Sequence, residues 1–312
     1  GCLGVPRALA EELRGTPRNP RNSEEPYHSP MSDVLWINGR FTTTDERVLG
    51  VEDRGFQFGD AVYEVFKFVG GRPAFMAEHF RRLTSGLDEL EIGHPWPDSA
   101  SFQETMRELV ARTAFEAGIV YIQVTRGEAE RAHFWPERIT PTAVAYSRRM
   151  TFPDAVKKDR GIKVITTSDL RWQGCNVKSV NLLGNALAKK QAQRAGVDEA
   201  LLLAGGTVRE GASSNFFAVR GGRLITHPLD EHVLPGVVRD KVIDLALDAR
   251  IRVDERPLRE AELFDLDEAF MTSTTQAVMP ITEVDGRAIG NSRCGEITRR
   301  LQEQFDQLEA RA

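Results

Sequence analysis

Five pairs of turn residues divide the chain into short strand-like runs, and these pairs limit its fold more than any other feature. They are Asn38-Gly39, Gly70-Gly71, Gly205-Gly206, Gly221-Gly222 and Asp285-Gly286. Such pairs tolerate the positive φ angles of tight two-residue turns, and strand-like segments lie beside each of them. The chain is therefore expected to contain several β-hairpins.

Segments in which apolar residues recur at helical spacing alternate with these strands. The clearest, at 77–90, places Phe80, Leu83, Leu87 and Leu90 on one face. Four more helices are expected at 102–117, 182–195, 237–250 and 294–308. Gly118 is expected to be the C-cap of the helix at 102–117. Strands are expected at 34–37, 62–69, 120–125, 142–146, 162–166, 199–203, 216–219, 224–226 and 269–271. This pattern predicts the α+β class, with helices that cover sheets.

Three regions differ in composition. Residues 1–30 are rich in Pro, Arg and small polar residues and have no strand pattern, which predicts a disordered extension. A small domain is expected at 31–150 and a large domain at 151–312, with the polar segment 147–161 as the linker. The length of 312 residues suits two domains of ordinary size.

Composition excludes several classes of function. The chain is 41% hydrophobic and 28% charged with a net charge of -5, which favours a soluble protein that binds neither nucleic acid nor an anionic membrane. No apolar run approaches the roughly 20 residues of a membrane span. The three cysteines, Cys2, Cys175 and Cys294, have neither metal-site nor disulfide spacing, so no metal and a cytoplasmic location are expected.

An amine and a carboxylate stand out in the second half. Lys178, in CNVKSVNLLGN, is followed by Glu210 in REGASSNFF. A lone lysine or turn glutamate usually lies at the surface in water. Here apolar neighbours such as Val177 and Leu183 indicate partly buried surroundings for the lysine, which favour a nucleophilic amine.

Two later segments are suited to bind a phosphate. LPGVVRD at 234–240 opens a helix, whose first N–H groups attract anions, and hydroxyl side chains cluster at 272–275. Each feature alone is common. In this order, an amine, a carboxylate, a helix start and hydroxyls match the needs of pyridoxal 5′-phosphate (PLP). The amine forms a Schiff base, the carboxylate holds the protonated ring nitrogen, and the other groups bind the phosphate.

Longer matches extend this pattern over nearly the whole chain from Met31 onward. They are EDRGFQFGDAVYEV (52–65), EHFRRL (78–83), VTRGEAERAHFWP (124–136), DLRW (169–172), KSVNLLGN (178–185) and MTSTTQ (271–276). With them the chain resembles the fold-type IV PLP enzymes, and among these the D-amino acid transaminases. The resemblance implies two mixed α/β domains with the cofactor site between them.

The resemblance also implies roles for single residues. Lys178 would be the Schiff-base lysine and the proton carrier between the substrate Cα and cofactor C4′, and Glu210 would be the partner of the ring nitrogen. Tyr63 would help to hold the substrate carboxylate. The other cofactor-binding residues would be Arg82, Ser213, Ser214, Asn215, Leu234, Val237, Val238, Ser273 and Thr274.

Arg131 and His133 form the R-x-H pair that indicates the subclass. In the D-amino acid transaminases this pair reaches into the neighbouring subunit's site and binds the substrate α-carboxylate, so a homodimer with active sites at the interface is expected. A guanidinium fork matches a carboxylate in geometry. The implied reaction moves the amino group of a D-amino acid, such as D-alanine, to a 2-oxo acid, such as 2-oxoglutarate, by a ping-pong route.

Three alternatives on the same fold remain open: an aminodeoxychorismate lyase, an L-branched-chain transaminase and an (R)-amine transaminase. The R-x-H pair argues against the lyase and the amine enzyme, because the lyases lack this loop and the amine substrates lack a carboxylate. Four departures from the family pattern, Phe56, Ala61, Arg209 and Ala212, put substrate preference in doubt rather than the reaction, and Arg209 would add a charge near the cofactor.

Overall fold

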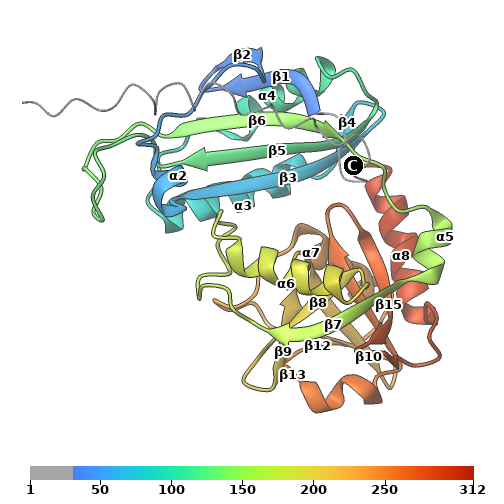
Figure 1. Ribbon diagram of the computed structural model, residues 1–312. Coiled ribbons are helices and arrows are strands. Elements are labelled where there is room, and N and C mark those ends of the chain that lie inside the picture. The colour runs from blue at the N-terminus through green and yellow to red at the C-terminus, as the bar shows by residue number, and fades with distance from the viewer. Residues whose placement is uncertain (1–30) are drawn as a thin grey trace, which may run out of the picture. The chain divides into compact units, whose positions relative to one another are not determined.

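A six-stranded antiparallel sheet occupies the first half of the structure. The computed structural model describes residues 31–312 (Figure 1). The strands run in the order β2-β1-β6-β5-β3-β4. Their bounds are β1 (Met31–Ile37), β2 (Arg40–Thr43), β3 (Ala61–Val69), β4 (Arg72–Pro73), β5 (Ala117–Thr125) and β6 (Thr142–Arg149).

Tight turns connect the hairpins as predicted. Asn38 and Gly39 have φ angles of 42° and 90°, and Ile37 pairs with Arg40 on either side of them. These angles are those of a type I′ turn, which suits the twist of the two strands. The turn signals at 70–71, 205–206, 221–222 and 285–286 likewise lie between paired strands, so all five predictions are confirmed.

Three helices accompany this sheet: α2 (Arg54–Phe58), α3 (Met76–Glu89) and α4 (Ser99–Ala111). The apolar face of α3 buries Leu83 and Leu87 in a cluster with Phe66 and Phe68 of β3. Asp98 begins α4 by accepting a hydrogen bond from the N–H of Ser101 at 2.8 Å. The spacing of apolar residues therefore decides which face of each helix meets the sheet.

A ten-stranded mixed sheet occupies the second half. The parallel pairs are β7 with β8, β7 with β15, and β11 with β12, while the other pairs are antiparallel. The bounds are β7 (Ile162–Ser168), β8 (Glu199–Ala204), β9 (Thr207–Gly211), β10 (Asn215–Arg220), β11 (Arg223–Thr226), β12 (Val253–Glu255), β13 (Leu258–Arg259), β14 (Glu268–Ser273), β15 (Ala277–Val284) and β16 (Arg287–Ala288).

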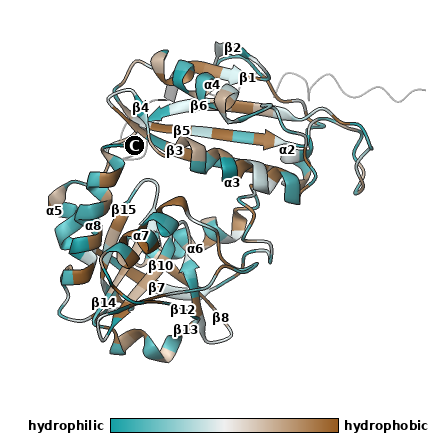
Figure 2. Cartoon of the chain, turned by 180° about the vertical axis from the view of Figure 1, so that it is seen from behind, coloured by the Kyte–Doolittle hydropathy of each residue, from teal (hydrophilic) through white to brown (hydrophobic). Residues whose placement is uncertain are grey.

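Helices pack on this sheet and on each other. They are α5 (Ala155–Arg160), α6 (Leu183–Arg194), α7 (Val237–Asp248), the 3₁₀ helix η1 (Glu260–Asp265) and α8 (Glu296–Glu309). One core cluster joins α7, α8 and the strands β10 and β14 through residues such as Val242, Phe217, Phe270 and Phe305. In Figure 2 much of α8 has the hydrophilic colour, whereas the neighbouring strands β14 and β15 carry more of the hydrophobic colour. None of the helices described in 31–312 has the length and apolarity that a membrane span requires.

One prediction about local structure was wrong. The helix expected at 102–117 ends at Ala111, and Gly118 lies inside β5 instead of capping a helix. A Cβ on Gly118 would stand 2.3 Å from the carbonyl oxygen of Arg148, so the glycine permits the close approach of β6. The segment 147–161, expected as the linker between domains, contains the end of β6 and the helix α5 and leads into β7, and the division into domains stays a prediction. The disorder expected at 1–30 lies outside the described residues.

We predict that Leu83→Ala lowers the free energy of unfolding by about 2–5 kcal/mol, because Leu83 is only 2% exposed and truncation leaves a cavity. The matched control is Leu247→Ala on α7, where the side chain is 57% exposed and the change should cost no more than about 0.5 kcal/mol. Urea unfolding of both variants tests the difference. Equal losses would contradict the placement of Leu83 in the core.

Candidate active site

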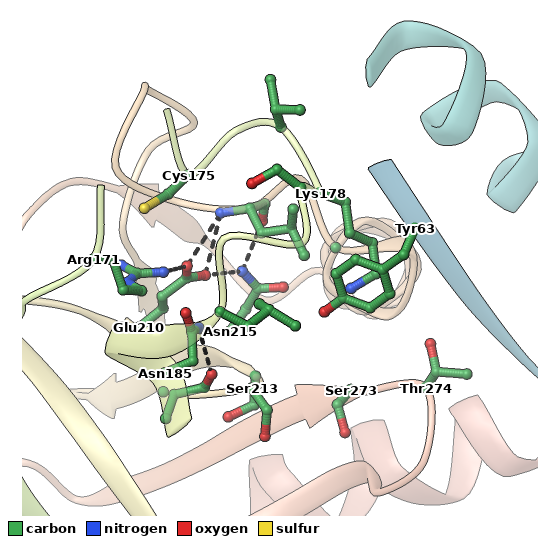
Figure 3. A pocket seen from close by; sticks show the side chains of 18 of the residues that line it. Tyr63, Arg171, Cys175, Lys178, Asn185, Glu210, Ser213, Asn215, Ser273 and Thr274 are labelled. Atoms are coloured by element: carbon green, nitrogen blue, oxygen red, sulfur yellow. Dashed lines mark hydrogen bonds and ion pairs between the residues drawn. The ribbon is translucent and has the colours of Figure 1, made fainter. Parts of the chain in front are cut away.

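One cavity of about 320 Å³ receives side chains from both sheets and from the segments that follow them (Figure 3). Tyr63 of β3 and Arg82 of α3 come from the first half of the chain, and Lys178, Glu210 and Ser273 come from the second. These residues lie up to 210 positions apart in the chain, since 273 − 63 = 210. Only the packing of the two halves brings them together.

Lys178 lies in a loop that pairs with β3. The N–H of Tyr63 donates to the carbonyl of Lys178 at 2.9 Å, and the N–H of Val180 donates to the carbonyl of Ala61 at 3.1 Å. The Lys178 Nζ stands 4.3 Å from the centre of the Tyr63 ring. No acidic side chain within 31–312 pairs with this amine. Its backbone is therefore held while its amine stays available in the cavity.

Burial around Lys178 agrees with the prediction only in part. Val177 is 6% exposed, whereas Leu182 and Leu183, which also suggested buried surroundings, are 37% and 74% exposed. Helix α6 begins at Leu183, and Leu182 is its N-cap residue, so both leucines lie at the exposed N-terminus of the helix. The amine is therefore sheltered by β3 and Tyr63 rather than by the apolar residues that follow it.

Glu210 is buried beside the guanidinium of Arg171. Asn215 Nδ2 donates to Glu210 Oε2 at 2.8 Å, and the N–H of Leu234 lies 3.2 Å from the same oxygen. Arg171 Nη1 donates to Oε1, and its Nε and Nη2 bind Asp169 at 2.9 and 2.8 Å. Figure 3 shows Arg171 and Asn215 converging on Glu210.

This cluster has one positive charge for two carboxylates, so it carries a surplus negative charge. Burial raises the pKa of Glu210 to about 7, although Arg171 acts in the opposite direction. A cation placed against Glu210 would balance the charge and lower that pKa again. The site therefore fits a protonated ring nitrogen.

A second buried ion pair joins α3 to the loop before α7. Arg82 binds Glu64 through Nε at 2.9 Å and Nη2 at 2.7 Å, and its Nη1 donates to the carbonyl of Pro235 at 3.1 Å. Burial alone would raise the pKa of Glu64, but Arg82 and His79 lower it below its usual range. Glu64 is thus ionised and fixes the guanidinium at the cavity wall.

Several hydrogen-bond donors from α7 and β14 line the same cavity. Helix α7 begins at Val237, and its N-cap residue Gly236 offers no side-chain hydrogen bond, so the first N–H groups of the helix lack intrahelical partners. Ser273 ends β14 and Thr274 follows it on the same lining, and the buried Thr272 hydroxyl has no hydrogen-bond partner among the described residues. With Arg82, these groups fit a phosphate.

The cavity lining brings together twelve of the fourteen residues predicted for the site. They are Tyr63, Arg82, Lys178, Glu210, Ser213, Ser214, Asn215, Leu234, Val237, Val238, Ser273 and Thr274. Within it, the Ser213 hydroxyl donates to Glu199 at 2.9 Å and the Ser214 hydroxyl to the sulfur of Met271 at 3.1 Å. The roles of these residues remain predictions.

Arg131 and His133 do not line this cavity. Both are exposed in the loop between β5 and β6, where they pack against Phe58 of α2. The Arg131 guanidinium lies 5.0 Å from the centre of the Phe58 ring, and the rings of Phe58 and His133 are 5.9 Å apart. Within 31–312, no carboxylate pairs with Arg131. Its charge is therefore free to bind an anion.

The structure shows the contacts of two departures from the family pattern, Arg209 and Ala212. Arg209 donates to His227 at 2.8 Å and lies 3.8 Å from Asp230, and it is absent from the cavity lining. The added charge expected near the cofactor is therefore directed elsewhere. Ala212 does line the cavity, where its carbonyl accepts a hydrogen bond from Asn185 at 2.8 Å.

Sequence reasoning did not assign Arg171 or Glu64. Arg171 was part of the DLRW match, but nothing in the sequence pairs it with a carboxylate 39 positions later. Glu64 did leave a signal, because alternation along β3 places a charged residue among the buried Val62, Phe66 and Phe68. A charge on a core-facing strand position indicates a buried partner.

The sequence profile described as amino-transferase class IV matches residues 61–284, which is most of the chain. This chain belongs to the class IV aminotransferases. Among curated class IV relatives, the D-alanine aminotransferase of Bacillus licheniformis is 37% identical over 266 residues, which cover 85% of this chain and 93% of that protein. The D-alanine aminotransferase of Staphylococcus haemolyticus is 34% identical over 281 residues, covering 89% and 99%.

Solved structures of class IV aminotransferases share the fold. The branched-chain amino acid aminotransferase from Escherichia coli has a TM-score of 0.81 and 25% identity, covering 89% of this chain and 94% of that one. The T.th. branched-chain amino acid aminotransferase with pyridoxamine 5′-phosphate has a TM-score of 0.82 and 27% identity, covering 90% and 95%. The predicted fold-type IV architecture of the α+β class is therefore confirmed.

We predict that Arg171→Met destabilises this aminotransferase, freed of cofactor, by about 3–5 kcal/mol near pH 8, because two buried carboxylates lose their cation. Without Arg171 the pKa of Glu210, which burial already raises, rises further above its unfolded value, and the pKa of Asp169 loses the lowering effect of the guanidinium and rises as well. A carboxyl with a raised folded pKa favours unfolding as pH increases, so the loss should shrink at about pH 5.

Chemical unfolding at both pH values tests this. The control is Arg256→Met, which breaks a more exposed pair with Glu262 and should cost about 1 kcal/mol or less. A loss for Arg171→Met that does not change with pH would contradict the electrostatic account.

Proposed function

We propose that this aminotransferase moves the amino group of a D-amino acid, such as D-alanine, to a 2-oxo acid, such as 2-oxoglutarate, with PLP as cofactor and in a ping-pong sequence. The observation that carries the proposal is the loop bearing Arg131 and His133, whose guanidinium has no carboxylate partner within residues 31–312 of its own subunit. The D-alanine aminotransferases at 34% and 37% identity over nearly their whole length support it. Binding of pyridoxamine 5′-phosphate by the T.th. relative supports the choice of cofactor.

The residues around the cavity suit PLP at each end. Glu210 would hold the ring nitrogen, supported by Arg171 and Asn215. Arg82, the α7 N–H groups and the hydroxyls of Ser273 and Thr274 would hold the phosphate, and Leu234 would pack on the ring. Bound there, PLP withdraws electrons from the substrate Cα and carries the amino group between the two half-reactions.

Lys178 would hold the cofactor between turnovers and then move the proton between the substrate Cα and cofactor C4′. Its loop is fixed to β3, so the amine works from one side of the cofactor plane. Tyr63 stands beside the amine and would help to orient the substrate carboxylate. Stereochemistry then depends on which end of the cavity holds that carboxylate.

The carboxylate would be held by a second subunit. Arg131 and His133 are exposed and lie outside the cavity lining of their own chain, so a homodimer would complete each site. Large exposed apolar side chains in nearby segments would be covered in such a dimer, as large exposed patches usually mark interfaces. They are Val51, Phe56, Phe134, Trp135, Leu170, Trp172, Leu183 and Leu187.

We also propose domains at 31–150 and 151–312 and a cytoplasmic location. The division has the support of the two sheets, whose strands fall at 31–149 and 162–288. Two free buried cysteines, Cys175 and Cys294, support a reducing compartment.

An L-branched-chain transaminase is the second candidate, because the branched-chain enzymes share this fold at 25% and 27% identity. It has weaker support than the D-specific reaction, since the identities to the D-alanine enzymes are higher. The two candidates differ in the hand of the amino acid that the enzyme deaminates.

We predict that D-alanine, and not L-alanine or L-leucine, discharges the visible absorbance of the cofactor-loaded enzyme, with pyruvate as the product. A spectrum recorded during each addition measures the half-reaction directly. Lys178→Ala is the control, because it retains the phosphate-binding groups but lacks the amine. Discharge by the L-amino acids alone would replace the proposal with the L-branched-chain assignment.

We predict that Arg131→Ala raises the KM for D-alanine about ten- to hundredfold, the usual effect of losing a charged hydrogen bond to a carboxylate. Cofactor absorbance should stay unchanged, since Arg131 lies outside the cofactor cavity. Arg138→Ala, which removes another exposed arginine from the same loop, is the matched control. Steady-state kinetics test the difference, and an unchanged KM in Arg131→Ala would remove the carboxylate role.

A further inference from the structure

The motif EDRGFQF at 52–58 supplies no residue to the cavity, yet Arg54 within it is only 2% exposed. We propose that Arg54 is a positioning residue that holds the loop carrying Arg131 and His133 in the shape that binds the substrate carboxylate. The inference rests on the proposed function, because it assigns a task to that loop.

Arg54 binds the loop backbone on both sides of His133. Its Nη1 donates to the carbonyl of Ala132 at 2.7 Å and lies 3.3 Å from the carbonyl of Phe134, while its Nη2 lies 3.5 Å from the carbonyl of His133. One buried guanidinium thus reaches three consecutive carbonyls. These are the residues that directly follow Arg131.

The same motif also holds the start of the loop. The backbone N–H of Arg54 donates to the carbonyl of Gly127 at 2.9 Å, and the N–H of Ala129 donates to the carbonyl of Glu52 at 3.3 Å. Asp53 accepts a hydrogen bond from the Thr125 hydroxyl at 2.8 Å. The segment from 125 to 134 is therefore fixed at both ends by residues 52–54.

Asp60 orients the guanidinium. Its Oδ2 accepts from Arg54 Nε at 2.8 Å and from Arg126 Nε at 2.7 Å, so one carboxylate serves two buried arginines. The guanidinium of Arg126 lies 3.9 Å from the centre of the Trp135 ring. Trp135 directly follows the three residues whose carbonyls Arg54 contacts. Phe58, one turn after Arg54, is the ring against which Arg131 and His133 pack.

Few apolar side chains of the loop are buried. Phe134 is 78% exposed and Trp135 is 43% exposed, so few buried apolar contacts restrain this part of the loop. Polar contacts to its backbone therefore decide its shape. A planar guanidinium with several fixed donors can bind three carbonyls together, whereas a lysine ammonium offers one compact group on a flexible stem.

The test compares the cofactor-loaded enzyme with Arg54→Gln and Arg54→Lys. The expected result is a KM for D-alanine raised about tenfold or more in Arg54→Gln, a smaller rise in Arg54→Lys, and unchanged kcat and cofactor absorbance in both. Arg256→Gln, which loses the pair with Glu262 far from the loop, is the matched control and should leave KM unchanged. Partial rescue by lysine separates positioning from a general loss of stability.

Hydrogen exchange gives a second measurement that does not depend on catalysis. Amides at 127–134 should exchange faster in Arg54→Gln than in the parent enzyme, while those at 199–204 keep their rates. Unchanged KM together with unchanged exchange would overturn the inference. If Arg54→Gln does not fold, Arg54→Lys and Asp60→Asn carry the same comparison.

Failure of the proposed function looks different. The parent enzyme would then not act on D-amino acids at all, and this result concerns Arg131, Lys178 and the cavity rather than Arg54. In that case the exchange experiment alone decides the inference. Faster exchange at 127–134 supports the positioning role of Arg54, and unchanged exchange overturns it.

Discussion

The electrostatics of the cavity depend on one buried guanidinium, that of Arg171. It lies between Asp169 and Glu210 and also donates to the carbonyl of His232 at 3.0 Å. Through these contacts it joins the segment before Lys178, the strand β9 and the loop before α7. Two carboxylates against one cation leave a negative charge in a buried place, which is costly unless a positive group binds there. The contacts of Arg171 with Asp169 and Glu210 thus shape the site and favour the binding of a cationic ligand there.

Arginine–carboxylate pairs recur wherever segments far apart in the sequence must meet. Glu64 and Arg82 connect β3 to α3 and then to Pro235 before α7. Asp60 connects Arg54 and Arg126, and through them the loop of Arg131. Removing one partner of such a pair leaves a buried charge without compensation, so each pair tolerates little change. These clusters fix the positions of the loops, in which the proposed chemistry takes place, relative to the sheets.

Much of the fold was accessible from local patterns. The hairpin at Asn38-Gly39 and the helix α3 follow directly from turn chemistry and from the 3.6-residue period, which act over a few neighbours. The expected helix at 102–117 was wrong at its C-terminal end. Gly118 is required by the close approach of the strand at Arg148, 30 positions later, and not by a helix C-cap. The candidate site divides in the same way. Lys178, Glu210, the hydroxyls at 272–275 and the start of α7 stood in recognisable motifs, whereas the role of Arg171 depends on the two carboxylates that it binds in space.

The sequence by itself determined many of the elements, the order of the reactive groups and the family, because turns, periodicity and motifs are properties of neighbouring residues. Only the tertiary structure decided that Arg171 pairs with Glu210, that Arg209 lies outside the cavity and that Arg54 binds the loop of Arg131. These contacts join residues 18 to 80 positions apart. Hydrogen bonds and ion pairs act over a few ångströms, so a linear pattern does not contain them until the sheets have packed.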